Sequence, residues 1–213
     1  MLSAASILAL GFVLGMRHAL DPDHVVAVST IVSEQRSLSR ASRIGALWGV
    51  GHTATILLVG GAMLVFRLTI PARVGLAFEF AVAVMLVVLG VRNLRRPSGD
   101  HGVHSAMRPL AVGFVHGLAG SAFVAVLVLG AIREPLLGLF YLLVFGIGTI
   151  AGMTAVTAAI ALPSTYAAAR VGNMRQYLRV ASGVASVAFG LVLAHQIGVV
   201  DGLFTATPHW DPK

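Results

Sequence analysis

Two histidines and two aspartates lie within seven consecutive residues near the start of this 213-residue chain: His18, Asp21, Asp23 and His24. The residues on both sides of this group are almost all apolar, as in a membrane-spanning segment. An ionisable side chain costs about 2.5–3.5 kcal/mol at the centre of a membrane helix, so such residues usually mark an ion or proton path. Imidazole nitrogens with carboxylate oxygens suit Ni²⁺, Co²⁺, Zn²⁺, Mn²⁺ or Fe²⁺ and do not choose among them. We therefore expect the function of the chain at this cluster.

A proline determines how the cluster is shaped. Aspartate is a preferred helix N-cap and proline suits the first helical position, so Asp21 and Pro22 predict that the first helix breaks and restarts here. On an unbroken helix, His18 and His24 would point about 120° apart, because each residue turns the helix by about 100°. A break can bring the two imidazoles together. We expect Asp21 to be the cap and Asp23, with the two histidines, to recognise a metal.

Four further ionisable residues are candidates, of which His52 is expected as the next metal donor and the other three as supporting residues. His52 lies in a Gly-His-Thr sequence one short loop after the cluster, where it could be a third imidazole or a helix–helix hydrogen-bond partner. His116 has the same two interpretations, and Glu79 could carry a proton or a counter-charge. Arg17 precedes Asp21 by four residues and could neutralise it on a helix. Under that alternative the first span would end before the cluster, which would then lie at the membrane interface.

The composition is that of an all-α integral membrane protein. Hydrophobic residues make up 57% of the chain and charged residues 11%, whereas soluble domains contain about 25% charged residues. A membrane helix needs about 20 mostly apolar residues. We expect one transmembrane transporter domain over residues 1–213, which crosses the lipid bilayer six times. The six expected spans are about 4–32, 44–66, 74–93, 109–132, 136–162 and 177–200.

The net charge of +7 follows the loops between these spans. Arginines are concentrated after the first, third and fifth expected spans, and the positive-inside rule places those loops in the cytoplasm. Both termini would then be extracytoplasmic, in a multi-pass protein of the cytoplasmic membrane. This distribution explains the basic charge without a nucleic-acid partner. The chain has no cysteine, which excludes disulfides and thiolate metal sites.

The polar segment 94–108 is the best internal boundary, and we read it as a cytoplasmic linker between half-repeats of about 1–93 and 109–200. Each half holds three expected spans, so the second copy would insert upside down. That is the inverted-repeat plan of many transporters, whose binding sites lie on broken helices near the midplane. Two short glycine-rich matches relate the halves, namely 11–15 to 113–117 and 49–53 to 146–150.

The stretch from Arg17 to His24 resembles the His-x4-Asp-His signature of the NiCoT nickel/cobalt permeases. The Gly-His-Thr sequence at His52 resembles that family's second motif. The resemblance implies that His18, Asp23 and His24 recognise the metal, with His52 as a further candidate. It also implies that the transported substrate is Ni²⁺ or Co²⁺. Typical members have eight spans and acidic motifs in their second half, so this chain is more similar to the short branch that includes urease-accessory nickel permeases.

These observations predict high-affinity Ni²⁺/Co²⁺ uptake by a secondary transporter with no resident cofactor. Efflux is the alternative, although efflux relatives often have a long histidine-rich loop where this chain has His101 and His104. His18-x4-Asp23 also matches the catalytic spacing of glycerolipid acyltransferases, in which an aspartate orients a general base. The chain lacks the basic phosphate-binding motif that such enzymes need, so we do not expect an enzyme. The sequence leaves open the metal, the coupling ion, and whether the chain acts with other copies or with an accessory protein.

Overall fold

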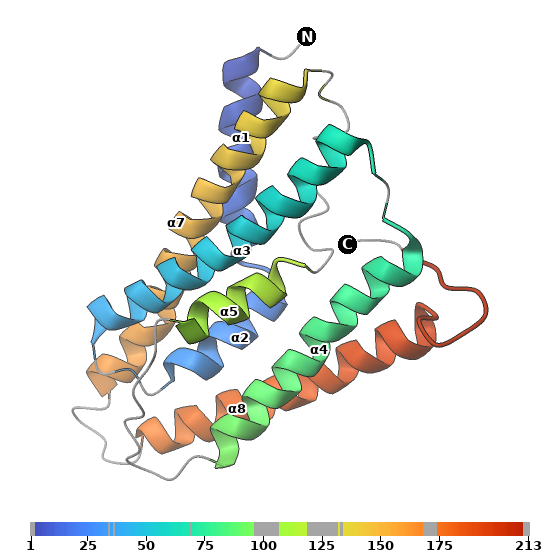
Figure 1. The fold of residues 1–213 in the computed structure, drawn as a ribbon. Helices are drawn as coiled ribbons and strands as arrows, with labels where there is room; N and C mark the ends of the chain where they lie inside the picture. The colour runs from blue at the N-terminus through green and yellow to red at the C-terminus, as the bar shows by residue number, and fades with distance from the viewer. Residues whose placement is uncertain are drawn as a thin grey trace.

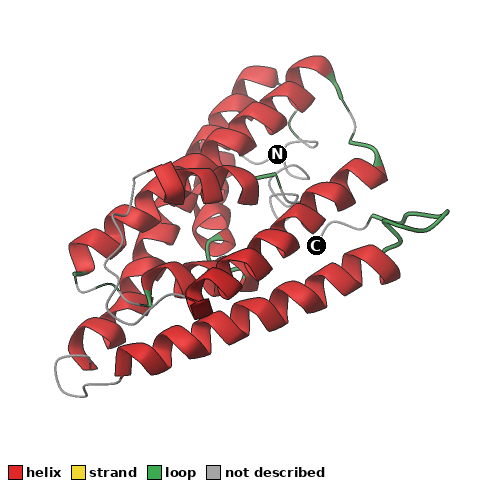
Figure 2. Cartoon of the chain, turned by 60° about the horizontal axis from the view of Figure 1, so that its bottom comes forward, coloured by secondary structure: helices red, strands yellow, loops and turns green. Residues whose placement is uncertain are grey.

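The computed structural model describes residues 3–33, 35, 37–68, 70–95, 107–118, 132, 134–167 and 174–210. Every regular element in this part of the chain is a helix (Figures 1 and 2), which confirms the all-helical prediction. A short π-helix, η2, continues the last α-helix directly. The elements are α1 (Ala4–His18), α2 (Pro22–Val32), α3 (Leu38–Phe66), α4 (Ala72–Arg95), α5 (Met107–His116), α7 (Pro135–Ala167), α8 (Met174–His195) and η2 (Gln196–Val200).

The described helices fit a multi-pass membrane protein. Four spans are long and apolar enough to cross a bilayer, and they come from α3, α4, α7 and the continuous helix of α8 with η2. The bent pair α1 and α2 provides a fifth candidate. Helix α5 covers the start of the expected span 109–132, but its 10 residues would extend only about 15 Å. Residues 119–131 lie outside the described part of the chain, so the count of six stays a prediction.

The expected linker 94–108 is described at its two ends alone. The end of α4 and the start of α5 fall within it, while residues 96–106 lie outside the described residues. That undescribed stretch includes His101 and His104, whose placement in a loop therefore stays a prediction.

The predicted break in the first helix is present. Helix α1 ends at His18, α2 begins at Pro22, and the two helices are bent by 55° relative to each other. Pro22 occupies the first turn of α2, as its fixed φ angle and missing N–H favour. Asp21 holds the N-cap position, but its side chain makes no capping hydrogen bond. The predicted N-cap position of Asp21 is therefore confirmed, whereas its carboxylate does not form the capping hydrogen bond, because it bonds to an imidazole instead, as described below.

The helices of the first half of the chain pack against those of the second half. Helix α1 packs along α7, α5 packs along α3, and α3 and α7 also contact each other extensively. Helix α4 pairs with α8, and the short α2 lies among α4, α7 and α8 (Figure 1). This pairing is the one expected of an inverted repeat, which stays a prediction. Glycines allow close contact at these interfaces, since Gly15 meets the carbonyl oxygen of Phe145 and Gly113 that of Trp48.

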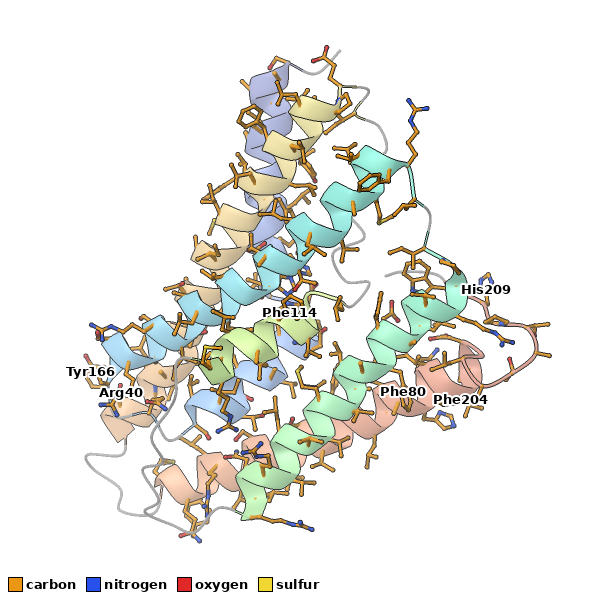
Figure 3. The ribbon with its side chains drawn as sticks, in the orientation of Figure 1. Arg40, Phe80, Phe114, Tyr166, Phe204 and His209 are labelled. Atoms are coloured by element: carbon orange, nitrogen blue, oxygen red, sulfur yellow. The ribbon has the colours of Figure 1, made fainter. Side chains whose placement is uncertain are left out.

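The helix ends that carry the arginine-rich loops gather at one end of the molecule. The starts of α3 and α8 lie there with the ends of α4 and α7 (Figure 1), and Arg40 and Tyr166 are labelled in that region in Figure 3. At the opposite end, the C-terminal segment folds back on α4, with the rings of Phe204 and Phe80 edge to face at 5.2 Å (Figure 3). The arrangement agrees with the expected loop assignment, while the orientation of the termini stays a prediction.

The packing of α5 against α3 can be tested by a glycine-to-alanine substitution, which adds one methyl group at the contact. A Cβ at Gly113 would strike the backbone carbonyl of Trp48, whereas a Cβ at Gly61 would meet its nearest neighbour, Leu139, at an ordinary 3.8 Å. Gly113→Ala should cost about 1–3 kcal/mol of stability through overpacking, and Gly61→Ala should be tolerated. Thermal unfolding of the two purified variants in detergent measures the difference. Equal melting temperatures would show that these helices do not pack as described.

Candidate metal centre

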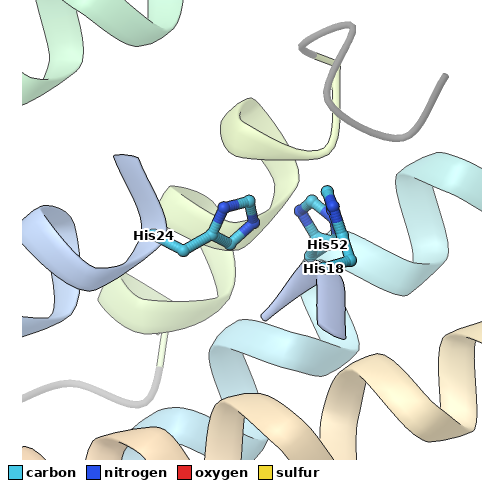
Figure 4. Close-up of side chains that lie close together, drawn as sticks. All are labelled: His18, His24 and His52. Carbon is cyan, nitrogen blue, oxygen red and sulfur yellow. The ribbon is translucent and has the colours of Figure 1, made fainter. Parts of the chain in front are cut away.

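Four histidines from four different helices meet inside the molecule. His18 is the last residue of α1, His24 lies in the first turn of α2, His52 lies midway along α3 and His116 ends α5. Their exposed fractions are 6%, 1%, 0% and 0%, respectively. Figure 4 shows the first three, with the rings of His18 and His52 together and that of His24 facing them. The break at Pro22 is what allows His24 to face His18, from which an unbroken helix would turn it away.

The imidazoles lie close enough to share a cation. The Nε2 atoms of His18 and His52 are 2.9 Å apart and form a hydrogen bond, in which one of the two nitrogens carries the proton. The ring centroid of His24 is 4.7 Å from that of His18, 5.1 Å from that of His52 and 4.2 Å from that of His116. Among the described residues, two groups of three have ligand atoms that all lie within 4.8 Å of one another. They are His18, His24 and His52, and Asp23, His24 and His116.

Two carboxylates hold the rings in place. Asp23 accepts hydrogen bonds through Oδ1 from the Nδ1 of His24 at 3.0 Å, and through Oδ2 from the Nε2 of His116 at 2.8 Å. The Oδ2 of Asp21 lies 2.8 Å from the Nδ1 of His18. Within the described residues, the ion-pair partner of Asp21 is therefore His18, whereas the Arg17 side chain is exposed. The alternative in which Arg17 neutralises Asp21 is not the arrangement found.

These bonds fix which nitrogen of each ring is free. A carboxylate only accepts, so neutral His18 and His24 carry their proton on Nδ1 and neutral His116 carries it on Nε2. Metal-binding histidines commonly donate their second N–H to a carboxylate in this way. Among the described residues, the buried nitrogens without a hydrogen-bond partner include Nε2 of His24 and Nδ1 of His52 and His116. An unsatisfied buried group of this kind costs about 1–3 kcal/mol, which a bound cation would recover.

Aromatic rings form the walls of the site. Trp48 stacks on His24 with centroids 5.5 Å apart and planes inclined by 27°, and it also contacts His116 at 5.5 Å. Phe145 lies 5.6 Å from His18 on the other side. These rings cover the buried imidazoles on two sides, so the nitrogen and oxygen atoms of the histidines and of Asp23 are the polar groups that a cation would meet there. The sequence interpretation had not identified Trp48 or Phe145 as part of the site.

The remaining candidates are placed as follows. Glu79 lies on α4 and accepts a hydrogen bond at 2.9 Å from Nε1 of Trp210 in the C-terminal segment, and it belongs to neither group of three. His116 had weak support from sequence, yet it is central here. A Gly-x-x-His spacing precedes both His18 and His116 and could have identified it. The acyltransferase pairing of His18 with Asp23 is not formed among the described contacts, since Asp21 bonds to His18 instead.

The role of Asp21 predicts the tautomer of His18. In the unchanged protein, His18 should be protonated at Nδ1, and Asp21→Ala should release the ring into a mixture of tautomers because the acceptor is gone. Nitrogen-15 NMR of histidine-labelled protein distinguishes the two tautomers. Asp201→Ala is the matched control, since Asp201 bonds to Gln196 in the C-terminal segment. A His18 ring protonated at Nε2 in the unchanged protein would contradict the assignment.

Comparison with known proteins identifies relatives along most of the chain. It is 36% identical over 217 residues to "Urease accessory protein UreH" of Bacillus sp. (strain TB-90), covering 93% of this chain and 95% of the relative. It is 29% identical over 198 residues to a "Putative nickel/cobalt efflux system" of Methanocaldococcus jannaschii, covering 87% and 91%. These two names describe accessory and transport proteins, not enzymes.

A more distant relative is a plant protein. The "Chloroplast protein FOR GROWTH AND FERTILITY 2" of Arabidopsis thaliana is 28% identical over 203 residues, covering 86% of this chain and 54% of the relative. No protein-family model and no solved structure matches the chain.

Proposed function

Because this chain belongs to the NiCoT-like family that includes the urease accessory protein UreH, we propose that it carries Ni²⁺ or Co²⁺ through the membrane as a secondary transporter. In this proposal the direction is uptake across the cytoplasmic membrane. The proposed cation path runs through His18, Asp23, His24 and His52, the main candidates from the sequence, and through His116, a supporting candidate whose inclusion its hydrogen bond to Asp23 supports. The second half of the chain then contributes a ligand of its own.

The observation that carries this proposal is the buried cluster of four imidazoles, three of which are bonded to the carboxylates of Asp21 and Asp23. Borderline divalent metals such as Ni²⁺ and Co²⁺ are bound well by imidazole nitrogens together with a carboxylate oxygen. Two nitrogens bound to one cation at about 2.1 Å and at a right angle lie about 3.0 Å apart. The 2.9 Å between Nε2 of His18 and Nε2 of His52 is a hydrogen bond that also fits that spacing, so a cation bound by both nitrogens would take the place of the proton between them. Such right-angled coordination is typical of Ni²⁺ and other six-coordinate or square-planar ions.

The driving force comes from outside the chain in this proposal. The sequence has no Gly-x4-Gly-Lys-Ser/Thr motif, so it has no nucleotide-binding loop of that kind. A membrane potential of about 100 mV is worth about 2.3 kcal/mol per charge, or about 4.6 kcal/mol for an inward divalent cation. The packing of α1 on α7 and of α5 on α3 supports an inverted repeat, whose halves would rock around the cluster.

Efflux is the second candidate, and one relative favours it. The archaeal relative is named an efflux system, and it is similar over 87% of this chain. The UreH relative is named an accessory protein of urease. If this chain has the same task, it would supply metal to an enzyme inside the cell, which requires uptake. The direction of radiometal movement separates these two proposals.

Uptake should depend on the cluster and not on histidines elsewhere. Cells that express the chain should accumulate radioactive nickel, and competition with unlabelled Co²⁺, Zn²⁺ and Mn²⁺ should rank the metals. His18→Ala, His52→Ala and Asp23→Asn should abolish accumulation while membrane insertion is retained. His209→Ala is the control, because His209 is exposed in the C-terminal segment, far from the cluster (Figure 3). Unchanged accumulation in the cluster variants would exclude this path, and faster loss of preloaded nickel would indicate efflux.

Binding should also be visible through Trp48. The chain has two tryptophans, so Trp210→Phe leaves Trp48 as the sole emitter. Because Trp48 stacks on His24, Ni²⁺ should quench its fluorescence with saturation, and adding His24→Ala should remove the saturable part. Mg²⁺, which prefers oxygen ligands and retains its waters, should have little effect. Quenching that is equal with and without His24 would place the ion elsewhere.

A further inference from the structure

We propose that the cluster is two overlapping cation stations that share His24, and that the transported cation passes from one station to the other. The proposal rests on the proposed function, because it concerns the same cargo. The first station is His18, His24 and His52, three imidazoles whose ligand atoms lie within 4.8 Å of one another. Its three side chains are buried, since none is more than 6% exposed.

The second station has a different composition. It consists of Asp23, His24 and His116, again with ligand atoms within 4.8 Å of one another. Because Asp23 accepts hydrogen bonds from Nδ1 of His24 and Nε2 of His116, a cation in this station would take the place of at least one of these hydrogen bonds. Its Asp23 carboxylate supplies a negative charge that the first station lacks, and its side chain is 16% exposed. His116 brings α5 into the site, so the second station joins both halves of the chain. A carboxylate with two imidazoles is a donor set that divalent transition metals accept as well as three imidazoles.

His24 allows only one station to be filled at a time. A neutral imidazole has one nitrogen with a free lone pair, so His24 can complete either station but not both. The transfer is short, because the ring centroid of His24 lies 4.7 Å from that of His18 and 4.2 Å from that of His116. The rings of His52 and His116 are farther apart, at 6.1 Å. The protein therefore holds one cation, which moves across His24.

Backbone contacts relate the two stations to the two halves of the chain. In each of the pairs α1 with α7 and α5 with α3, a glycine of one helix meets a backbone carbonyl of the other. In each pair a second, reciprocal contact lies nearby. Three residues after the contacted carbonyl, a glycine of the second helix meets the carbonyl that lies three residues before the glycine of the first helix. The four contacts are Gly15 with Phe145, Gly148 with Phe12, Gly113 with Trp48, and Gly51 with Leu110.

This register makes His18 the counterpart of His116. Each histidine follows the contacting glycine of its own helix, Gly15 or Gly113, by three residues. The sequence match had paired Gly15 with Gly117, one helical turn later. Equivalent positions in the two halves thus supply one imidazole each, His18 to the first station and His116 to the second. A rocking motion of the halves that opens one station would leave the other intact, with His24 between them.

Co²⁺ binding and transport by the full-length protein test the proposal together. The purified chain in detergent is titrated with Co²⁺, whose visible spectrum reports its ligands, and radioactive cobalt uptake is measured in proteoliposomes. The variants are His52→Gln, His116→Gln and His24→Gln, with His209→Gln as the control. We expect the unchanged protein to bind one Co²⁺. His52→Gln and His116→Gln should each still bind one, with different spectra, and His24→Gln should bind none. Uptake should fall at least about tenfold in all three cluster variants.

The outcomes that overturn the two stations are distinct from those that overturn the proposed function. Loss of binding in both His52→Gln and His116→Gln would indicate a single site, and uptake by His116→Gln at the unchanged rate would remove the second station from the path. Binding of two ions by the unchanged protein would contradict the sharing of His24. In contrast, an unchanged protein that neither binds nor carries any of the competing metals would overturn the function itself. Asp23→Asn gives a second test of the second station, since it should behave as His116→Gln does.

Discussion

The break between α1 and α2 is the constraint on which the candidate site depends. Pro22 cannot continue a helix begun by α1 without a clash and a lost hydrogen bond, so the chain turns by 55° and restarts. The turn leaves His18 at the end of one helix and His24 at the start of the next, with ring centroids 4.7 Å apart. It also exposes no long stretch of backbone, because the turn is only three residues long and bonds back to α1 through Leu20 and Asp21.

Small residues at the helix contacts are the second requirement for bringing the four imidazoles together. His52 and His116 can reach the cluster only if α3 and α5 approach backbone to backbone, and the glycines at 51, 113 and 117 permit that approach. Close packing without side chains is a common basis of helix association in lipid, where the hydrophobic effect does not draw helices together. The same glycines therefore explain both the stability of the helix pairs and the position of the imidazoles. Carboxylates at Asp21 and Asp23 then fix the rotation of the rings, which packing alone would not determine.

Much of the helical order could be predicted from local patterns, and much of the site could not. Apolar run length predicted the helices that became α3, α4, α7 and α8, and the Asp-Pro pair predicted the break. Long-range contacts could not be predicted, since nothing in the sequence shows that Glu79 bonds to Trp210 or that Trp48 stacks on His24. The local bond between Asp21 and His18 was also missed, because it forms only across the turn between the two helices. The predicted inverted repeat stays a prediction. Of its two sequence matches, the one that pairs Gly51 with Gly148 agrees with the backbone contacts, whereas the one that pairs Gly15 with Gly117 differs from them by one turn, because glycines recur every four residues there.

The central claim is that buried imidazoles replace water around a transported transition metal. X-ray absorption at the metal edge of Ni²⁺-loaded, purified protein tests it most directly, because scattering from imidazole rings differs from that of water ligands. The account predicts a nitrogen-and-oxygen shell containing at least two imidazoles in the unchanged chain, which is replaced by a water-dominated shell in His24→Ala. A fully hydrated Ni²⁺ in the unchanged protein, or an imidazole shell that survives in His24→Ala, would contradict it.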